Sequence, residues 1–432
     1  MPKRFSGLWR HPDFLRLWAG QTVSVFGSQI TVLALPLTAV FWLDASPGQL
    51  GVLNALQTLP FLAIGLFVGA WVDRRRRRPI LVGADLGRAL LLGSVPLAAA
   101  LDRLTLVHLY AVGLLAGVLT VCFDVAYQSY LPSLVARRQL VEGNSRLEVS
   151  NATARVAGPG LAGVLVQLIT APGAIALDAL SFVASALLLG SIGGDEEPPT
   201  AERARRSIWR EIGEGIDQVI HHPLLRPLAL STATSNLCNG MIGAVFIFFL
   251  ARDLALAPSV IGLTYAAGSV GGLLSALLVA RVARRTGVGP AIVAGKAVMG
   301  ASAALIPLAG GPLPLAVTLL IVSRFFGSGG TVVSNVNQVS LRQAITPPQL
   351  LGRVNATMRF IDWGALPLGA LLGGLLGETL GIRPTLALGA AGMALGVLWV
   401  LFSPILALRE PPAPEDESTV CRPVAGAARA DR

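Results

Sequence analysis

The chain has 432 residues, of which 53% are hydrophobic and only 13% are charged, and its mean hydropathy is +0.67. Soluble proteins carry about 25% charged residues, so too few polar side chains remain to coat a soluble protein of this length. An ordinary soluble enzyme, a disulfide scaffold and a disordered chain are therefore excluded. The net charge of +10 does not predict nucleic-acid binding, because the basic residues fall between apolar runs.

The apolar runs predict a polytopic helical membrane protein, since a helix crosses the hydrocarbon layer with about 20 apolar residues. The first run is too long for a cleavable signal peptide, and a second follows at once. In chain order, twelve such runs lie at 14–43, 49–72, 79–101, 105–131, 144–169, 173–192, 227–250, 259–280, 287–309, 312–337, 350–377 and 383–408.

The basic residues predict the orientation of these helices. With the N-terminus inside, 27 of the 34 Lys and Arg residues lie on inner segments and 3 on outer loops. Basic residues are enriched in cytoplasmic loops. We therefore expect a multi-pass protein of a bacterial-type cytoplasmic membrane, with both termini in the cytoplasm.

Two bundles of six helices are expected, over residues 1–192 and 223–409. Residues 193–222 form a cytoplasmic linker, in which apolar and charged residues alternate at helical spacing between Ile208 and Ile220. That pattern is typical of a helix lying on a membrane surface or covering its own protein. The tail 410–432 is rich in Pro, Ala and charge, and we expect it to be disordered.

The two predicted bundles are related by an internal repeat with an offset of 211 residues, which makes them pseudo-symmetric. Two parallel halves of this kind are found in many secondary transporters, which bind substrate near the bilayer midplane. The offset is carried by three matched pairs, His11-Pro12 with His222-Pro223, Asn144 with Asn355, and Gly158 with Gly369.

Polar stripes recur in both halves. Polar groups facing lipid cost free energy, so such stripes face either a neighbouring helix or an aqueous cavity. Their recurrence in both halves favours a cavity. The predicted cavity residues are Gln21, Ser24, Ser28, Thr31, Thr120, Tyr127 and Gln128 in the first half and Thr232, Ser235, Asn239, Thr331 and Asn335 in the second. We expect them to be accompanied by the aromatic residues Phe26, Phe246 and Trp363.

Ionisable residues inside spans are costly and point to function. The candidates for proton coupling are Asp124, Asp362, Arg155 and Arg324, with Lys296 at similar depth. Asp124 is the first of these, because it shares a helix face with polar residues and lies far from the inner rim. The alternative is that each acid is neutralised by a neighbouring Arg in a structural pair, as we expect for Asp85 and Arg88.

Residues 69–81 resemble the loop signature G-x-x-x-D-R-x-x-R-R-x-x-L of the major facilitator superfamily, with Arg76 where a glycine is usual. Residues 11–27 and 123–163 resemble its drug-exporter branch, which includes macrolide efflux permeases and the enterobactin exporter. That branch often carries an Asp at the position of Ser28, so a proton site there is not expected. The resemblance implies the major facilitator fold and a conformational latch at the inner rim, made by Gly69, Asp73, Arg74, Arg77 and Arg78.

We therefore expect a monomeric transporter, not an enzyme, that exports an amphipathic small molecule in exchange for protons. Cofactors and metals are not expected, and the chain has no nucleotide-binding loop of the G-x-x-x-x-G-K-[ST] type. Two alternatives stay open, uptake of a nutrient or lipid by the same fold and a membrane sensor that transports nothing.

Overall fold

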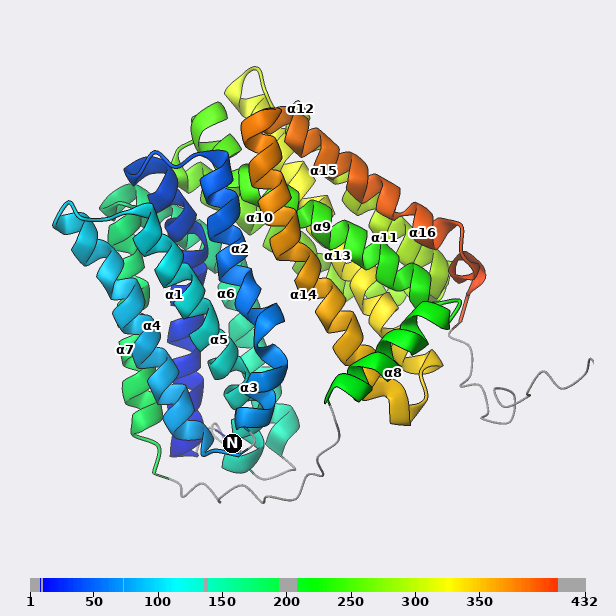
Figure 1. The fold of residues 1–432 in the computed structure, drawn as a ribbon, viewed down its shortest axis with the longest axis horizontal. Helices are drawn as coiled ribbons and strands as arrows, with labels where there is room; N and C mark the ends of the chain where they lie inside the picture. The colour runs from blue at the N-terminus through cyan, green and yellow to red at the C-terminus, as the bar shows by residue number, and fades with distance from the viewer. Residues whose placement is uncertain (1–7, 9–10, 73, 136–138, 194–207, 411–432) are drawn as a thin grey trace, which may run out of the picture.

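The computed structural model describes residues 8, 11–72, 74–135, 139–193 and 208–410, and within them the chain is helical. Figure 1 shows two helical halves side by side. The first half contains α1 (Pro12–Trp42), α2 (Pro47–Ala63), α3 (Gly65–Val72), α4 (Arg77–Ala100), α5 (Leu106–Leu134), α6 (Leu140–Ile169) and α7 (Ala171–Gly190). The second contains α9 (Leu225–Phe248), η3 (Phe249–Asp253), α10 (Pro258–Thr286), α11 (Val288–Ala303), α12 (Leu305–Leu308), α13 (Leu313–Ile345), α14 (Pro348–Thr379), α15 (Ile382–Gly396), α16 (Leu398–Leu401) and η4 (Pro404–Ala407).

Eleven helices of the described part are long and apolar enough to cross a membrane. The predicted run 49–72 is divided at Ile64 into α2, whose last turn contains Pro60, and α3. Proline removes a backbone donor and crowds the preceding turn, which breaks or bends a helix. The two pieces follow one another along the same edge of the first half (Figure 1). The predicted all-α membrane fold is confirmed.

Local sequence signals account for the helix starts. The side chain of His11 accepts a hydrogen bond from Phe14 N at 3.2 Å, and Pro12 occupies the first turn of α1. Ser46 and Gln49 form a reciprocal capping box at α2. Such caps satisfy backbone donors that a helix leaves free at its N-terminus.

The helices follow the internal repeat, and so do the contacts between the halves. We call the end that holds Arg74–Arg78 the basic end, and the other the opposite end. Gly163 of α6 packs on Gly262 of α10, and Gly51 of α2 packs on Gly374 of α14. The offset of 211 turns one pair into the other, so one close helix contact is made twice. Glycine permits such an approach of two backbones.

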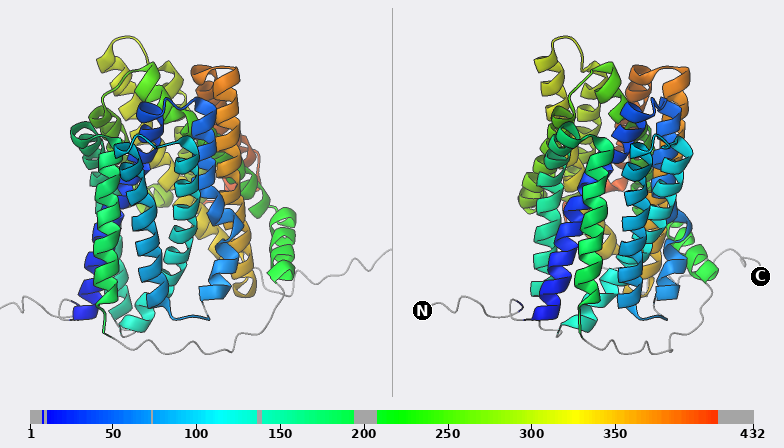
Figure 2. Two further views of the ribbon diagram at one scale, coloured as in Figure 1. Left: turned by 60° about the vertical axis from the view of Figure 1, so that its left-hand side comes forward. Right: turned by 90° about the vertical axis from the view of Figure 1, so that its left-hand side faces the viewer.

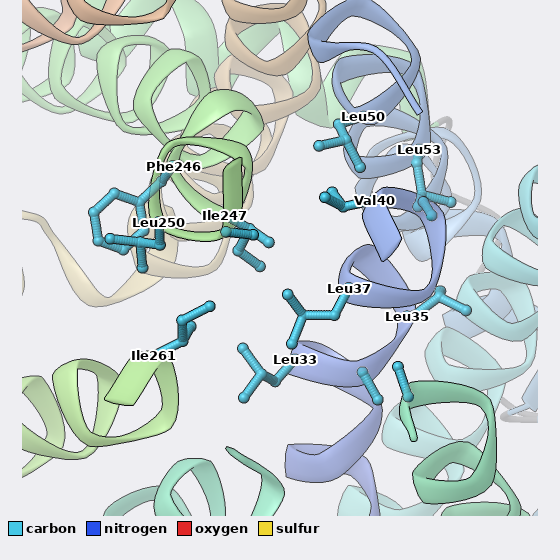
Figure 3. Packing of buried hydrophobic residues seen from close by; sticks show 14 of the residues in the cluster. Leu33, Leu35, Leu37, Val40, Leu50, Leu53, Phe246, Ile247, Leu250 and Ile261 are labelled. Carbon is cyan, nitrogen blue, oxygen red and sulfur yellow. The ribbon is translucent and has the colours of Figure 1, made fainter. Parts of the chain in front are cut away.

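The apolar cores show where the halves join. At the opposite end, a single cluster of buried residues includes side chains of both halves. Figure 3 shows Leu33 and Leu37 of α1 facing Ile247 of α9 and Ile261 of α10 in this cluster. Toward the basic end each half has a separate cluster of its own. Among the described residues the apolar cores of the halves therefore merge at the opposite end, and nearer the basic end the halves also touch where Phe61 of α2 stacks on Trp363 of α14.

Polar contacts reinforce this seal. Arg252 of η3 donates to the Val40 carbonyl oxygen at 2.7 Å and to the Asp44 carboxylate. Ser46 at the start of α2 donates to Glu378 near the end of α14. These contacts are exposed, and exposed ion pairs contribute only about 0–1 kcal/mol, so the apolar and glycine contacts dominate the seal.

The linker contains α8 (Ile208–His221), which lies beside the basic end of the second half (Figure 2). Val219 is buried in the apolar cluster of that half, whereas Ile220 is half exposed. The helix α8 packs against α9 and α14 of the second half. The expected disorder of the tail concerns residues of which only Glu410 lies within the described part.

Candidate substrate cavity and buried charges

A cavity of about 670 Å³ lies at the interface of the halves. Its walls come mainly from the second half, through α9, α10, α11, α13, α14 and α15, and the first half contributes α1 and α6. Many of the residues that line the cavity are polar, although they belong to membrane-spanning helices. The residues from the first half are Gln29, Val32, Leu33, Arg155 and Pro159.

The floor of the cavity is a network of hydrogen bonds in the second half. Lys296 is only 4% exposed and donates from Nζ to Ser235 Oγ at 3.1 Å. Thr232 donates to Gln338 Oε1 at 3.0 Å, which ties α9 to α13. Asp362 of α14 is the acid that interacts electrostatically with Lys296. Buried polar groups of this kind are stable only when they are hydrogen-bonded.

Arg324 lies on an aromatic wall. Its guanidinium carbon is 4.3 Å from the ring centre of Tyr265 and 5.1 Å from that of Phe246. A cation over a ring face is held by the ring quadrupole without being neutralised. Buried Arg324 Nε has no hydrogen-bond partner within the described part of the chain.

Nine residues predicted from the sequence do line this cavity. They are Thr232, Ser235, Asn239, Thr331, Asn335, Arg155, Arg324, Asp362 and Trp363. Phe246 lies behind the wall, where it supports Arg324 and Tyr265. The polar stripe of α9 thus faces the cavity.

The matching polar stripe of α1 does not face the cavity. Among the described lining residues, none is Gln21, Ser24, Ser28 or Thr31, nor the aromatic Phe26. The reason is that this face of α1 packs on α7. The hydroxyl of Thr31 donates to Asp178, and Gly27 lies against Ser181. The remaining hydroxyls bond to their own helix, since Ser28 donates to the Ser24 carbonyl oxygen at 2.9 Å.

The predicted residues of α5 also lie away from this cavity. Thr120 donates to the Ala116 carbonyl oxygen at 2.8 Å, and Gln128 is exposed. Tyr127 stacks on Phe123, with its hydroxyl buried and without a partner among the described residues. Asp124 is within electrostatic reach of Arg88 of α4.

Arg88 is the centre of a buried charge cluster in the first half. Its guanidinium lies between two rings, 4.4 Å from the centre of Phe123 and 4.2 Å from that of Phe182. It donates to Asp85, which is fully buried. The predicted pairing of Asp85 with Arg88 is seen here.

Asp178 of α7 is the member of this cluster that the sequence interpretation missed. It is 1% exposed, accepts hydrogen bonds from Thr31 and from Ser181 (3.1 Å), and lies within electrostatic reach of Arg88 and Asp85. The available signal was simple, because Asp178 is the sole acid in the apolar run 173–192. One guanidinium thus pairs with Asp85 and lies within electrostatic reach of two further carboxylates, those of Asp124 and Asp178.

Residues of the predicted latch lie at the basic end, where α3 is followed by α4. Arg78 donates from Nε to the Leu189 carbonyl oxygen at 3.1 Å and to the Gly190 carbonyl oxygen. It therefore caps the C-terminus of α7, where a helix presents free carbonyl groups and negative potential. Arg74 is exposed, Gly69 has open space beside it, and Asp73 lies outside the described residues.

Comparison with known proteins agrees with this architecture. The chain is 29% identical over 405 residues to the multidrug efflux pump Tap of Mycolicibacterium fortuitum, covering 90% of this chain and 95% of that protein. It is 24% identical over 375 residues to macrolide efflux protein A of Streptococcus pyogenes, covering 86% and 90%. The resemblance to a drug-exporter branch is confirmed by these relatives.

A crystal structure of a bacterial homologue of the iron transporter ferroportin, in its inward-facing state, has a similar fold. The TM-score is 0.72 at 20% sequence identity, over 92% of this chain and 99% of that one. A family model described as "Transmembrane secretion effector" matches residues 5–420. The chain therefore belongs to the transmembrane secretion effector family of the major facilitator superfamily, and it is a multi-pass membrane transporter.

Proposed function

We propose that this transporter exports an amphipathic small molecule from the cytoplasm in exchange for protons, by alternating access. The observation that carries the proposal is the cavity of about 670 Å³ between two repeated halves whose apolar cores merge at one end. Relatives with nearly the same length are named as multidrug and macrolide efflux proteins, which favours export over uptake.

The basic end is proposed to face the cytoplasm, by the enrichment of Lys and Arg there. The structure then corresponds to an inward-facing form, in which cytoplasmic substrate enters the cavity. Breaking the Gly51–Gly374 and Gly163–Gly262 contacts and closing the basic end would expose the same cavity to the outside. The latch residues Asp73, Arg74, Arg77 and Arg78 are proposed to hold that second state.

Proton coupling is assigned to the buried acids of the first half, with Asp124 as the exchanging group. Asp85 is committed to Arg88, and Asp178 is held by two hydroxyl groups. Asp124 has neither such an ion pair nor such hydroxyl donors, since no described residue donates a hydrogen bond to its carboxylate. A carboxylate with no fixed donor can gain and lose a proton without dismantling a hydrogen-bond network. In the second half, Asp362 is the corresponding candidate beside Lys296.

The test is flux in vesicles that contain only the purified protein. With the vesicle lumen made acidic, molecules of protein whose basic end faces outward should accumulate substrate inside. Accumulation in the opposite sense would favour uptake, and no flux of any compound in a broad panel would favour a sensor.

A further inference from the structure

The charges of the cavity do not balance. Its described lining contains Arg155, Lys296 and Arg324, and a single acid, Asp362. In a low-dielectric interior, an excess of positive charge is costly unless a counter-charge enters. Chloride or an anionic substrate can supply this counter-charge. The residues that line the cavity determine which of the two binds.

Each cation is held in a way that leaves its charge available. Lys296 Nζ is bonded to a neutral hydroxyl, Ser235 Oγ. Arg324 lies on Tyr265 and Phe246, and the described part of the chain gives it no carboxylate partner. Arg155 touches Glu148 at 3.4 Å, but both side chains are more than 60% exposed, so this pair is weak.

The internal repeat shows how the charges differ between the halves. The offset of 211 residues places Lys296, Met299, Asn335 and Gly389 where the first half has Asp85, Arg88, Asp124 and Asp178. Both Asp85 and Lys296 are buried at equivalent positions, with opposite charge. Three acids surround Arg88 in the first half, and two of the three cavity cations, Lys296 and Arg324, come from the second half.

From this arrangement we infer that the cavity takes a substrate that carries a carboxylate, sulfonate or phosphate group on an aromatic or aliphatic body, with the acidic group held by Lys296 and Arg324. This inference rests on the proposed function and names its substrate class. Tyr265 and Trp363 on the cavity wall supply ring faces for the body of the molecule. An apolar body also selects such an anion over chloride, since it removes apolar surface from water.

Binding is tested with two dyes that share one ring system and differ in charge. Carboxyfluorescein is an anion at pH 7.5, and rhodamine 123 is a cation. Fluorescence anisotropy with the wild-type protein in nanodiscs should show carboxyfluorescein binding at least about tenfold tighter, the effect of one charge-assisted contact. Equal binding, or tighter binding of the cation, would overturn the inference.

Variants of the lining should move anion affinity in both directions. Arg324→Gln and Lys296→Gln should each weaken carboxyfluorescein binding about tenfold or more, and Asp362→Asn should tighten it. Arg324→Gln keeps the test valid if Lys296→Gln folds poorly. A matched control is Arg281→Gln, an exposed Arg of α10 outside the described lining, which should leave affinity unchanged. Unchanged affinity in Arg324→Gln would contradict the assignment.

Binding and flux separate this inference from the proposed function. Tight anion binding with no flux in vesicles would support the substrate class and contradict transport. Flux of rhodamine 123 without binding or flux of carboxyfluorescein would support export and contradict the substrate class.

Discussion

Arg88 shows how one buried cation can serve three acids in different ways. It forms an ion pair with Asp85, while Asp124 and Asp178 are within its electrostatic reach. Its position between Phe123 and Phe182 fixes the guanidinium. The three acids therefore differ in how strongly the packing around Arg88 depends on their negative charge.

Asp85→Asn should destabilise the protein strongly, because it leaves the buried Arg88 guanidinium without its ion-pair partner. Breaking a buried ion pair costs about 3–5 kcal/mol. The measurement is thermal unfolding in detergent at matched purity. A melting temperature equal to that of the wild type would show that Asp124 or Asp178 replaces the lost partner.

Asp124→Asn should fold with normal yield and bind substrate, yet lose accumulation driven by a pH gradient. The amide keeps the volume of the carboxyl group but cannot exchange a proton. The measurement is dye accumulation in vesicles, with Asp85→Asn as the comparison for misfolding. Low yield would instead indicate a structural charge, and full accumulation would remove Asp124 from the coupling and move the search to Asp178 and Asp362.

Asp73→Asn should slow transport without reducing the amount of protein in the membrane, since it removes one charge from the proposed latch and preserves shape. Export rate at matched abundance is the readout. A wild-type rate would leave topology as the sole role of this loop.

At the scale of helices, the opposite end depends on two symmetric glycine contacts. A methyl group on Gly163 would lie 3.0 Å from Gly262 Cα, and one on Gly51 would lie 2.6 Å from the Ala370 carbonyl oxygen. Backbone atoms cannot yield as a flexible side chain can. Either change therefore has to push the two halves apart.

Gly163→Ala should shift the protein toward the state that is open at the opposite end. Labelling of Asn54→Cys by an impermeant maleimide reports this, because Asn54 lies at the interface, 3.4 Å from the Gly243 carbonyl oxygen. In a background without the native cysteines, Gly163→Ala should label faster. Gly83→Ala, which has open space around it, should label as the parent does. Arg252→Gln should have a smaller effect, since it removes an exposed ion pair with Asp44 and one hydrogen bond to the Val40 carbonyl oxygen, and leaves the close glycine contacts in place. Equal labelling of all four proteins would contradict the described seal.

The sequence predicted the helices and the repeat, because both follow from apolar length and spacing. Both polar stripes were predicted to line the cavity; the stripe of α9 does line the cavity described here, whereas the stripe of α1 packs on α7. Periodicity shows that Ser24 and Thr31 share a face, and only tertiary packing shows that this face meets Asp178. The break at Ile64 was missed for a related reason, since the apolar run continues past Ile64 while the helix is interrupted there.

At the scale of the whole molecule, the two halves have the same fold and different charges. Asp85 and Asp178 are buried in the first half, and Lys296 and Arg324 of the second half line the cavity. In the proposed mechanism, protons and substrate would therefore bind mainly in different halves, and rocking of the halves would couple them. This division explains how a repeated fold can bind two unlike species.

The most direct test of proton-driven export is accumulation of labelled substrate in reconstituted vesicles whose lumen is more acidic than the bath. Carboxyfluorescein, ethidium and a labelled macrolide can be followed in parallel. The account predicts that at least one of them accumulates inside above its bath concentration, and that a protonophore abolishes the accumulation. Equilibration without accumulation, or accumulation that survives the protonophore, would contradict it.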